Sequence, residues 1–353
     1  IPLLNPDHYF TRNPQYKTYY QRKIEHLSRA SLLLSISEHS RQEALDALDL
    51  RQHDVVNIST AADPLFSPIS PNEEESRKIK EKYDISKQFV LCTGGADERK
   101  NLSRLIQAYA NLGAEIRNIH QLVLVGKFSN DDINQLKKAA RSSGIKSSEL
   151  IITGYVSDAE LLLLYNLCKA YIFPSWHEGF GLPALEAMSC GAAVIGANTA
   201  SLPEVIGIVD ALFDPFSVRS MSEKLEHVLT DESYRIALKQ KCLQNAKRFS
   251  WDNCALNAIS ALERLHEKNQ KKSNTHVPVP THKSKLAYVS PLPPERSGIS
   301  GYSAVLLPEL SKFYNIEVIV AQDEISDLWI TSNCVIRDVE WFRAHANDYD
   351  RVI

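Results

Sequence analysis

The segment from Pro174 to Met188 joins a glycine loop to the start of a predicted helix. It reads Pro-Ser-Trp-His-Glu-Gly-Phe-Gly-Leu-Pro-Ala-Leu-Glu-Ala-Met and directly follows an apolar run that predicts a buried strand. Pro183 at the first helical position, with Gly179 and Gly181 just before it, leaves several backbone N–H groups unpaired at the positive end of the helix. This pattern predicts an anion site that suits a phosphate.

Two carboxylates belong to the same segment. Glu178 lies in the loop, and Glu186, with seven residues between them, lies about one turn into the helix, where both could face one ligand. Carboxylates accept hydrogen bonds from paired hydroxyls, so a ribose or a hexose suits them better than a phosphate, which their charge would repel. The alternative is that both acids merely favour the helix N-terminus. The adjoining glycine loop favours the ligand.

A second strand-to-helix junction occupies residues 91–102. Arg99 and Lys100 stand at the predicted helix N-terminus, where each cation is disfavoured by roughly 0.3–1 kcal/mol, so the pair predicts an anionic ligand such as a diphosphate. The alternative is that Asp97 and Glu98 pair with them at the surface, and a surface ion pair indicates little by itself.

The length and composition exclude several classes of protein. A chain of 353 residues exceeds what one hydrophobic core usually serves, and 44% apolar with 24% charged residues is typical of globular domains. Because the net charge is -3, the chain has no surplus of positive charge that could neutralise nucleic-acid phosphates. The six cysteines form no CxxC pair, so neither a zinc knuckle nor a redox pair is expected, and a reducing cytoplasm fits. No apolar run approaches the roughly 20 residues of a membrane-spanning helix.

Apolar, β-branched segments alternate with amphipathic ones, which predicts an α/β fold with parallel sheets covered by helices. Strands are predicted at 32–36, 55–58, 89–93, 122–125, 150–153, 171–174 and 193–195. Helices are predicted at 15–29, 41–48, 73–82, 102–112, 131–141, 159–168 and 183–189. Beyond Asp214 the pattern becomes helical at 217–229, 234–249 and 251–267, with Asp252 as a candidate cap. Near the end of the chain, the sequence predicts a strand at 285–290, a flexible glycine loop at 296–301, a helix at 302–313 and a strand at 316–320.

Breaks in this pattern divide the chain. Pro64, Pro68 and Pro71 predict a boundary, and a charged stretch followed by prolines predicts a linker. The expected parts are 1–66, 67–268, the linker 269–284, and 285–353. Because the chain opens without methionine and stops in a strand-like run, we expect a fragment of a longer protein.

The sequence at 178–188, Glu-Gly-Phe-Gly-Leu-Pro-Ala-Leu-Glu-Ala-Met, resembles the E-x7-E element of the retaining glycosyltransferases of family 4, which have the GT-B fold. Cys190-Gly191, residues 201–205 and Phe249-Ser250-Trp251 are similar to neighbouring motifs of that family. The resemblance implies that 67–268 is a complete Rossmann-like donor-binding domain. It also implies that 1–66 ends one acceptor domain and that 285–353 opens another, as in a tandem polysaccharide synthase.

The resemblance also assigns roles around the two carboxylates. Glu186 would bind the ribose diol, and Glu178 would hold the donor sugar together with the backbone of Gly179, Phe180, Gly181 and Leu182. His177 is assigned no chemistry, because a lone loop histidine is more often a packing or surface residue.

The diphosphate and the nucleobase are assigned in the same way. Lys100 and Arg99 would stabilise the leaving diphosphate, and Gly94, earlier in the same loop, would help to bind the donor. Arg99, Lys100 and Glu178 are therefore the predicted catalytic residues. Tyr155 and Val156 would contact the nucleobase through their main chain. The next residue, Ser157, is explained equally well as a helix cap.

The implied reaction transfers a hexose from a nucleotide diphosphate sugar to a growing glycan or lipid-linked glycan, with retention of configuration. No DxD-like aspartate cluster stands where a metal bridge would be expected, so neither a metal nor a cofactor is predicted. GDP-mannose is the favoured donor, since similar tandem enzymes build mannose-containing O-antigens, and UDP-glucose or ADP-glucose stays open.

Two other interpretations are a non-catalytic sugar-nucleotide binding module and a structural fragment without a ligand. Nucleic acid is not an expected partner. The expected location is the cytoplasm, which is compatible with peripheral association of the parent protein with the inner membrane. With half of an acceptor domain absent, the fragment itself is expected to be inactive or nearly so.

Overall fold

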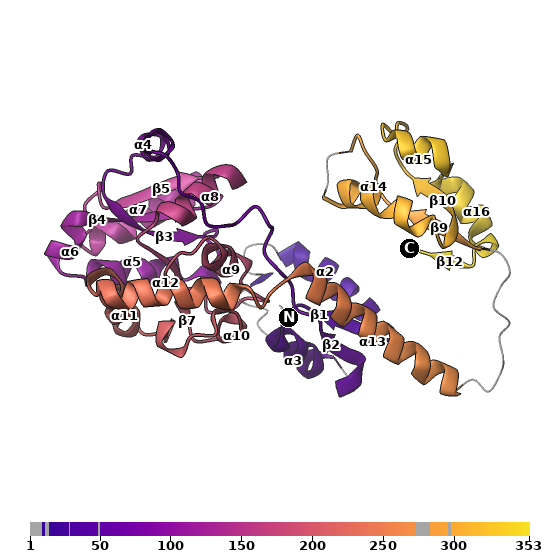
Figure 1. Cartoon of the computed structure of the whole chain (residues 1–353), viewed down its shortest axis with the longest axis horizontal. Helices are drawn as coiled ribbons and strands as arrows, with labels where there is room; N and C mark the ends of the chain where they lie inside the picture. Colours follow the sequence, from indigo (N-terminus) through magenta and orange to yellow (C-terminus); the bar gives the residue numbers. More distant parts are fainter. Residues whose placement is uncertain (1–8, 11–13, 28, 49, 273–282, 296–297) are drawn as a thin grey trace. The chain divides into compact units, whose positions relative to one another are not determined.

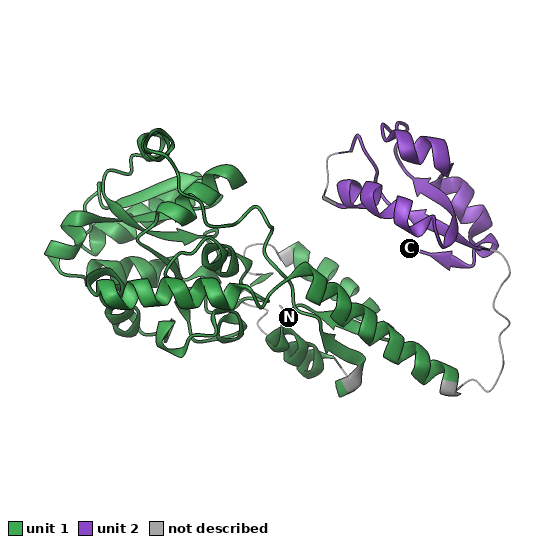
Figure 2. Ribbon diagram, viewed as in Figure 1, with its two compact units in different colours: residues 1–271 green, residues 272–353 purple. Residues whose placement is uncertain are grey.

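The structure is a computed structural model that describes residues 9–10, 14–27, 29–48, 50–272, 283–295 and 298–353. The chain forms two compact units, residues 1–271 and 272–353 (Figures 1 and 2). Most of the predicted linker, together with residues 1–8 and the predicted loop residues Arg296 and Ser297, lies outside the described residues. The boundary predicted near residue 66 falls within the first unit and stays a prediction.

A parallel sheet of six strands forms the centre of the first unit. The strands are β3 (Gln88–Thr93), β4 (His120–Val125), β5 (Leu150–Gly154), β6 (Ala170–Phe173), β7 (Val194–Ala197) and β8 (Leu212–Phe213). In space they follow the order β5-β4-β3-β6-β7-β8. The chain therefore builds outward from β3, returns to the centre with β6 and builds the other half. In doubly wound sheets, ligands bind outside the carboxyl ends of the strands at this switch.

The helices of this part of the chain are α4 (Glu73–Lys82), α5 (Leu102–Ala110), α6 (Ala114–Ile119), α7 (Asn130–Ser142), α8 (Asp158–Leu167), α9 (Leu182–Ser189), α10 (Leu202–Ile206), α11 (Val218–Thr230), α12 (Glu232–Ala246) and α13 (Trp251–Lys272), with the 3-10 helices η3 (Glu98–Lys100) and η4 (Val209–Ala211). Helices α5 to α10 lie between successive strands of this sheet, because parallel strands need crossover connections, while α4 precedes β3 and α11 to α13 follow β8. α5 packs against α7 and α11, while α9 packs against α8 and α12. Every residue of β4, β6 and β7 is buried, so both faces of the sheet are covered.

A smaller α/β segment precedes this sheet. It contains α2 (Pro14–Leu27), β1 (Leu33–Ser35), α3 (Glu38–Ala47), η2 (Gln52–Asp54) and β2 (Val55–Asn57), and the two strands pair in parallel. The hydroxyl of Ser37 caps α3 by accepting a hydrogen bond from the backbone N–H of Ser40. The same hydroxyl donates to the carbonyl of Gly179 at 2.6 Å, which places the start of α3 beside the loop that follows β6.

The second unit has a four-stranded parallel sheet in the order β11-β10-β9-β12. Its elements are β9 (Ser284–Val289), α14 (Gly298–Leu310), β10 (Tyr314–Val320), α15 (Leu328–Asn333), β11 (Val335–Asp338), α16 (Val339–His345), η5 (Ala346–Asp348) and β12 (Arg351–Val352). A separate core that includes Leu286, Leu307, Val318 and Ile330 supports it.

The flexible loop predicted at 296–301 is wrong from Gly298 onward, because α14 begins there. The side chain of Ser303 gives the physical reason. Its hydroxyl lies 2.7 Å from that of Ser290 and accepts a hydrogen bond from the Tyr288 hydroxyl at 3.1 Å. These contacts anchor the first turns of α14 to the end of β9, and this packing outweighs the low helix propensity of the two glycines.

The predicted α/β class with parallel sheets is confirmed, and the predicted strands and helices of the first unit are present with ends that differ by a few residues. The short elements α6, α10 and β8 were not predicted. The cap predicted at Asp252 is wrong, because the backbone N–H of Asn253 donates to the hydroxyl of Ser250. β6 ends at Phe173, since Pro174 has no N–H for a ladder hydrogen bond.

Candidate active site

The loops after β3 and β6 meet at one carboxylate oxygen, Oε1 of Glu178. Lys100 Nζ lies 2.6 Å from it, Arg99 Nη1 lies 3.2 Å from it, and the Ser175 hydroxyl donates to it at 2.6 Å. The side chains of Lys100 and Glu178 are only 14% and 12% exposed, so water screens this pair weakly. The structure thus brings the three predicted catalytic residues together at the switch point of the sheet.

Backbone contacts join the same two loops. The carbonyl of Arg99 accepts hydrogen bonds from the Trp176 N–H at 2.9 Å and from the Ser175 hydroxyl at 3.0 Å. In the other direction, Arg99 Nη1 donates to the carbonyl of His177 at 3.3 Å. Ser175 is buried and links all of these groups, a role that no sequence motif predicted. Its place two residues after a buried strand, within the predicted loop, was the available signal.

Glycines allow the lysine and the neighbouring loop to approach closely. Gly94 has φ of +147°, and a Cβ there would lie 3.3 Å from Cδ of Lys100. A Cβ on Gly126, which follows β4, would lie 1.8 Å from the carbonyl oxygen of Gly94, a distance that no real side chain occupies. Only glycine therefore fits at position 126.

The glycine loop before α9 is held by its carbonyl groups. The carbonyl of Gly179 accepts hydrogen bonds from the hydroxyls of Ser37 and Ser40, at 2.6 and 2.8 Å. The Ser201 hydroxyl is 3.0 Å from the carbonyl of Glu178 and 2.7 Å from that of Phe180. With these carbonyls bound to serines, the loop is fixed in place at the N-terminus of α9.

The first turn of α9 differs slightly from the prediction. Gly181 caps the helix with φ of +105°, Leu182 is its first residue, and Pro183 is its second residue rather than its first. The ring of Phe180 is buried against Phe249, so a ligand could contact only the backbone of Phe180, as the resemblance implies. Leu182 is 39% exposed.

Glu186 lies in the second turn of α9 and faces a tyrosine. The Tyr165 hydroxyl donates to Glu186 Oε2 at 3.0 Å, and burial raises the pKa of the Glu186 carboxyl. Burial also raises the pKa of Tyr171, and the negative charges of Glu186 and Glu178 raise it further. Both carboxylates are thus close enough to Tyr171 of β6 to affect its ionisation.

The predicted nucleobase contact lies at the end of β5. Gly154 has φ of +76°, the Tyr155 side chain is 69% exposed, and Val156 is buried. The Lys127 ammonium lies 5.4 Å from the centre of the Tyr155 ring. Ser157 caps α8 and forms a capping box with Glu160, so its structural role is established. Contact of Tyr155 and Val156 with the nucleobase stays a prediction.

His177 has a larger role than the sequence indicated. Its side chain is buried, its Nδ1 is hydrogen-bonded to the hydroxyl of Tyr9, and its Nε2 lies 2.6 Å from Oε1 of Glu43. Glu43 is 134 residues distant in the chain, and no spacing could have revealed the contact. The histidine is therefore a buried link between α3 and the loop of Glu178.

About half of the chain, residues 72–249, matches a protein-family model described as "Glycosyl transferases group 1". The chain belongs to the glycosyl transferases group 1 family. Its relatives include the serotype-specific mannosyltransferase WbdA of Escherichia coli, which is 40% identical over 271 residues, covering 77% of this chain and 33% of WbdA. O-antigen chain mannosyltransferase B of Escherichia coli is 34% identical over 258 residues, covering 72% of this chain and 66% of that protein. The chain thus spans about a third of the length of WbdA.

Solved structures of glycosyltransferases share the fold. Sucrose-phosphate synthase from Thermosynechococcus elongatus aligns with a TM-score of 0.58 at 20% identity, over 73% of this chain and 63% of that one. The predicted GT-B fold class is confirmed by such neighbours. For this group 1 glycosyltransferase chain, the assignment to family 4 and the retention of configuration stay predictions.

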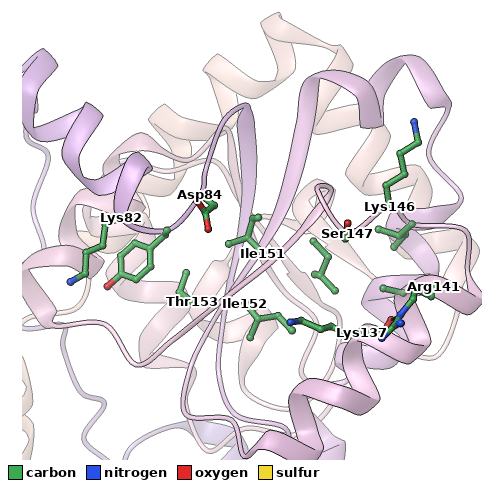
Figure 3. A pocket seen from close by; sticks show the side chains of 13 residues that line it. Lys82, Asp84, Lys137, Arg141, Lys146, Ser147, Ile151, Ile152 and Thr153 are labelled. Carbon is green, nitrogen blue, oxygen red and sulfur yellow. Dashed lines mark hydrogen bonds between the residues drawn. The ribbon is translucent and has the colours of Figure 1, made fainter.

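A separate cavity of this group 1 chain, about 680 Å³ in volume, lies along the edge strand β5 (Figure 3). Basic side chains border it, among them Lys137, Arg141 and Lys146. No predicted site residue lines it, and it is not at the β3–β6 switch, so we do not assign the sugar donor to it.

In this family member, Asn101 holds the loop after β6 in place through the hydrogen bonds of its side chain. It has φ of +60° and is buried, and its amide donates to the carbonyls of Pro174 and Pro215 at 3.1 and 2.7 Å. Asn101→Ala should lower the free energy of unfolding by about 2–4 kcal/mol, because two buried carbonyls lose their donor and alanine is strained in the left-handed conformation.

Urea denaturation monitored by the fluorescence of Trp176 and Trp251, with the second unit's tryptophans replaced by phenylalanine, measures this change. Asn101→Gly tolerates the left-handed backbone but lacks the amide, so the difference between the two variants isolates the strain. A stability of Asn101→Ala within 0.5 kcal/mol of wild type, on the scale of an ordinary surface substitution, would contradict the supporting role.

Proposed function

We propose that this chain binds a nucleotide diphosphate sugar at the carboxyl ends of β3 and β6, and that the protein to which it belongs transfers a hexose to a growing glycan with retention of configuration. The observation that carries the proposal is the convergence of Lys100 and Arg99 on Glu178 at the switch point of the sheet. Mannose is the proposed sugar and GDP-mannose the donor, since WbdA and mannosyltransferase B are named mannosyltransferases.

The chemistry follows from the charges in this cluster. When the bond between the sugar and the diphosphate breaks, negative charge develops on the diphosphate. Lys100, Arg99 and the N-terminus of α9 provide positive charge that is already in place, which lowers the barrier without reorganisation. In the present structure Lys100 and Arg99 share the single charge of Glu178, and Arg99 also pairs with Asp97 at 3.4 Å. A bound diphosphate would take over the ion pairs with Glu178 and leave that carboxylate to sugar hydroxyls. This account needs neither a bridging metal nor a cofactor.

Glu186 supplies the second half of the recognition. Its carboxylate is held by one hydrogen bond from Tyr165 and is partly desolvated, so it would accept strong hydrogen bonds from the two hydroxyls of a ribose. The main chain at Tyr155 and Val156 is proposed to meet the base.

The acceptor is proposed to be a glycan or a lipid-linked glycan. Within the described residues, no helix is long and apolar enough to cross a bilayer. Peripheral association with a membrane is a proposal that rests on the O-antigen relative and on no feature of the described surface.

Calorimetric and thermal-shift titrations with GDP, UDP, ADP and their sugar conjugates test the proposal. A ligand that binds only the folded chain raises the melting temperature according to its concentration and dissociation constant. We expect saturable binding of GDP and GDP-mannose, and weaker binding of the uracil and adenine nucleotides. A folded chain that responds to no nucleotide would refute a donor site here. Binding without transfer by any longer protein that contains this chain would favour a sugar-nucleotide binding module.

A further inference from the structure

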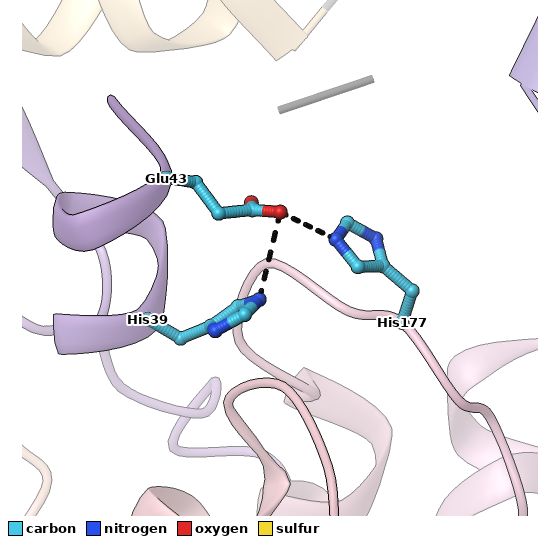
Figure 4. A group of neighbouring side chains, drawn as sticks. All are labelled: His39, Glu43 and His177. Carbon is cyan, nitrogen blue, oxygen red and sulfur yellow. Dashed lines mark hydrogen bonds and ion pairs between the residues drawn. The ribbon is translucent and has the colours of Figure 1, made fainter. Parts of the chain in front are cut away.

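His39, Glu43 and His177 form a cluster beside the proposed donor site, in which Glu43 and His177 are buried and the His39 side chain is 30% exposed (Figure 4). His39 and Glu43 are four residues apart on α3 and therefore share one helix face, and His177 projects from the loop after β6. Glu43 Oε1 lies 2.6 Å from His177 Nε2 and 3.6 Å from His39 Nε2. One nitrogen or oxygen atom from each residue falls within 4.8 Å of the other two.

Hydrogen bonds alone leave this cluster incomplete. His177 is satisfied when Tyr9 donates to its Nδ1 and its own Nε2–H donates to Glu43. The His39 Nε2 atom is then buried without a hydrogen-bond partner, because its distance of 3.6 Å from Glu43 Oε1 is too long for a hydrogen bond. An unpaired buried polar atom is costly, and its presence indicates a missing ligand.

We propose that His39, Glu43 and His177 bind a divalent transition-metal ion, with zinc as the expected metal. Two imidazole nitrogens and one carboxylate oxygen form a donor set that zinc commonly takes in proteins. The ion would occupy the space between the three atoms and give His39 Nε2 the partner that it lacks.

Binding of zinc requires an adjustment of these side chains, whose ligand atoms lie within 4.8 Å of one another. Zinc binds imidazole nitrogen and carboxylate oxygen at about 2.0–2.2 Å in tetrahedral geometry, which sets ligand atoms roughly 3.3 Å apart. The separation of His39 and Glu43 already approaches this value, and that of Glu43 and His177 must lengthen. Tyr9 then accepts a hydrogen bond from Nδ1–H of His177, the outer-shell contact that orients a metal-binding histidine.

Such an ion would join α3 to the loop that carries Glu178. His177 stands directly before Glu178, and its carbonyl accepts a hydrogen bond from Arg99. The metal would therefore fix the position of the donor loop against the preceding α/β segment. It would take no part in bridging the diphosphate, and the inference does not depend on which nucleotide the chain binds.

Metal analysis of the tag-free chain tests this inference. After removal of metal with EDTA and titration with zinc against a chromophoric chelator, we expect one zinc ion per chain and a rise in the melting temperature of several degrees. Cobalt(II) in place of zinc should give the intense visible absorption of a tetrahedral site.

Variants identify the ligands. His39→Gln and Glu43→Gln should each weaken zinc binding by more than 100-fold, whereas Tyr9→Phe should weaken it by about 10–100-fold as the loss of an outer-shell contact does. His227→Gln is the control, since that histidine lies in α11 and also pairs with an acid four residues on. Circular dichroism and melting in EDTA show whether each variant is folded.

The inference is overturned if the folded wild-type chain binds no zinc. It is equally overturned if folded His39→Gln and Glu43→Gln bind zinc as tightly as wild type.

Discussion

Replacing Lys100 with alanine is expected to weaken binding of a nucleoside diphosphate by about 10- to 100-fold, since a charge-assisted hydrogen bond contributes roughly 1.5–3 kcal/mol. Lys100 is mostly buried beside Glu178 and stands where the β3 loop meets the glycine loop. Removing its charge leaves Arg99 as the cation on Glu178 and reduces the positive potential available to a diphosphate. Calorimetry with GDP and with GMP measures the effect, and the loss should be larger for the diphosphate.

Lys169→Ala is a matched control for that variant. Lys169 precedes β6 at the opposite end of the strand, is 18% exposed, and also forms one ion pair, with Glu232. The Lys169→Ala variant should bind GDP with the same affinity as the wild-type chain. Equal weakening of GDP and GMP by Lys100→Ala would place the lysine elsewhere than at the diphosphate.

Glu186→Gln is expected to weaken nucleotide binding by about 10- to 100-fold while making the unliganded chain more stable at neutral pH. Burial raises the pKa of this carboxyl above its ordinary value of 4.5, so ionising it in the folded chain costs free energy. This cost is absent below the unfolded pKa and grows as the pH rises through the folded pKa. Glutamine is neutral and still accepts the hydrogen bond from Tyr165, so the stability gain should appear only above about pH 4.5.

Two measurements separate the ribose contact from a general effect on the fold. A 2′,3′-dideoxy nucleoside diphosphate should bind the wild-type chain and Glu186→Gln equally weakly, because it lacks the hydroxyls that the carboxylate accepts. Glu149→Gln is the control for a buried acid, since Glu149 pairs with Arg117 away from the site and should lose stability but keep its affinity for nucleotide. Discrimination between ribose and dideoxyribose that survives in Glu186→Gln would rule out the proposed contact.

The sequence by itself determined the elements and the family. Alternating apolar segments predicted the strands of the main sheet, and the glycine loop at 178–188 predicted where a ligand binds, because both signals are local and depend on residues close together in the chain. The same local reasoning failed at Gly298, where burial of Ser303 against β9 decides that the segment is helical.

Only the tertiary structure decided which groups meet. The convergence of Lys100 on Glu178 depends on β3 and β6 being neighbours in the sheet, and β4 and β5 separate these strands in the chain. The contact of His177 with Glu43 depends on the packing of α3 against the donor loop, between residues 134 positions apart. Local patterns in a sequence carry the propensity of each segment. Contacts between distant residues form because strands must pair in a sheet and apolar faces must be buried. The spacing of residues in one sequence does not show which segments will pack together.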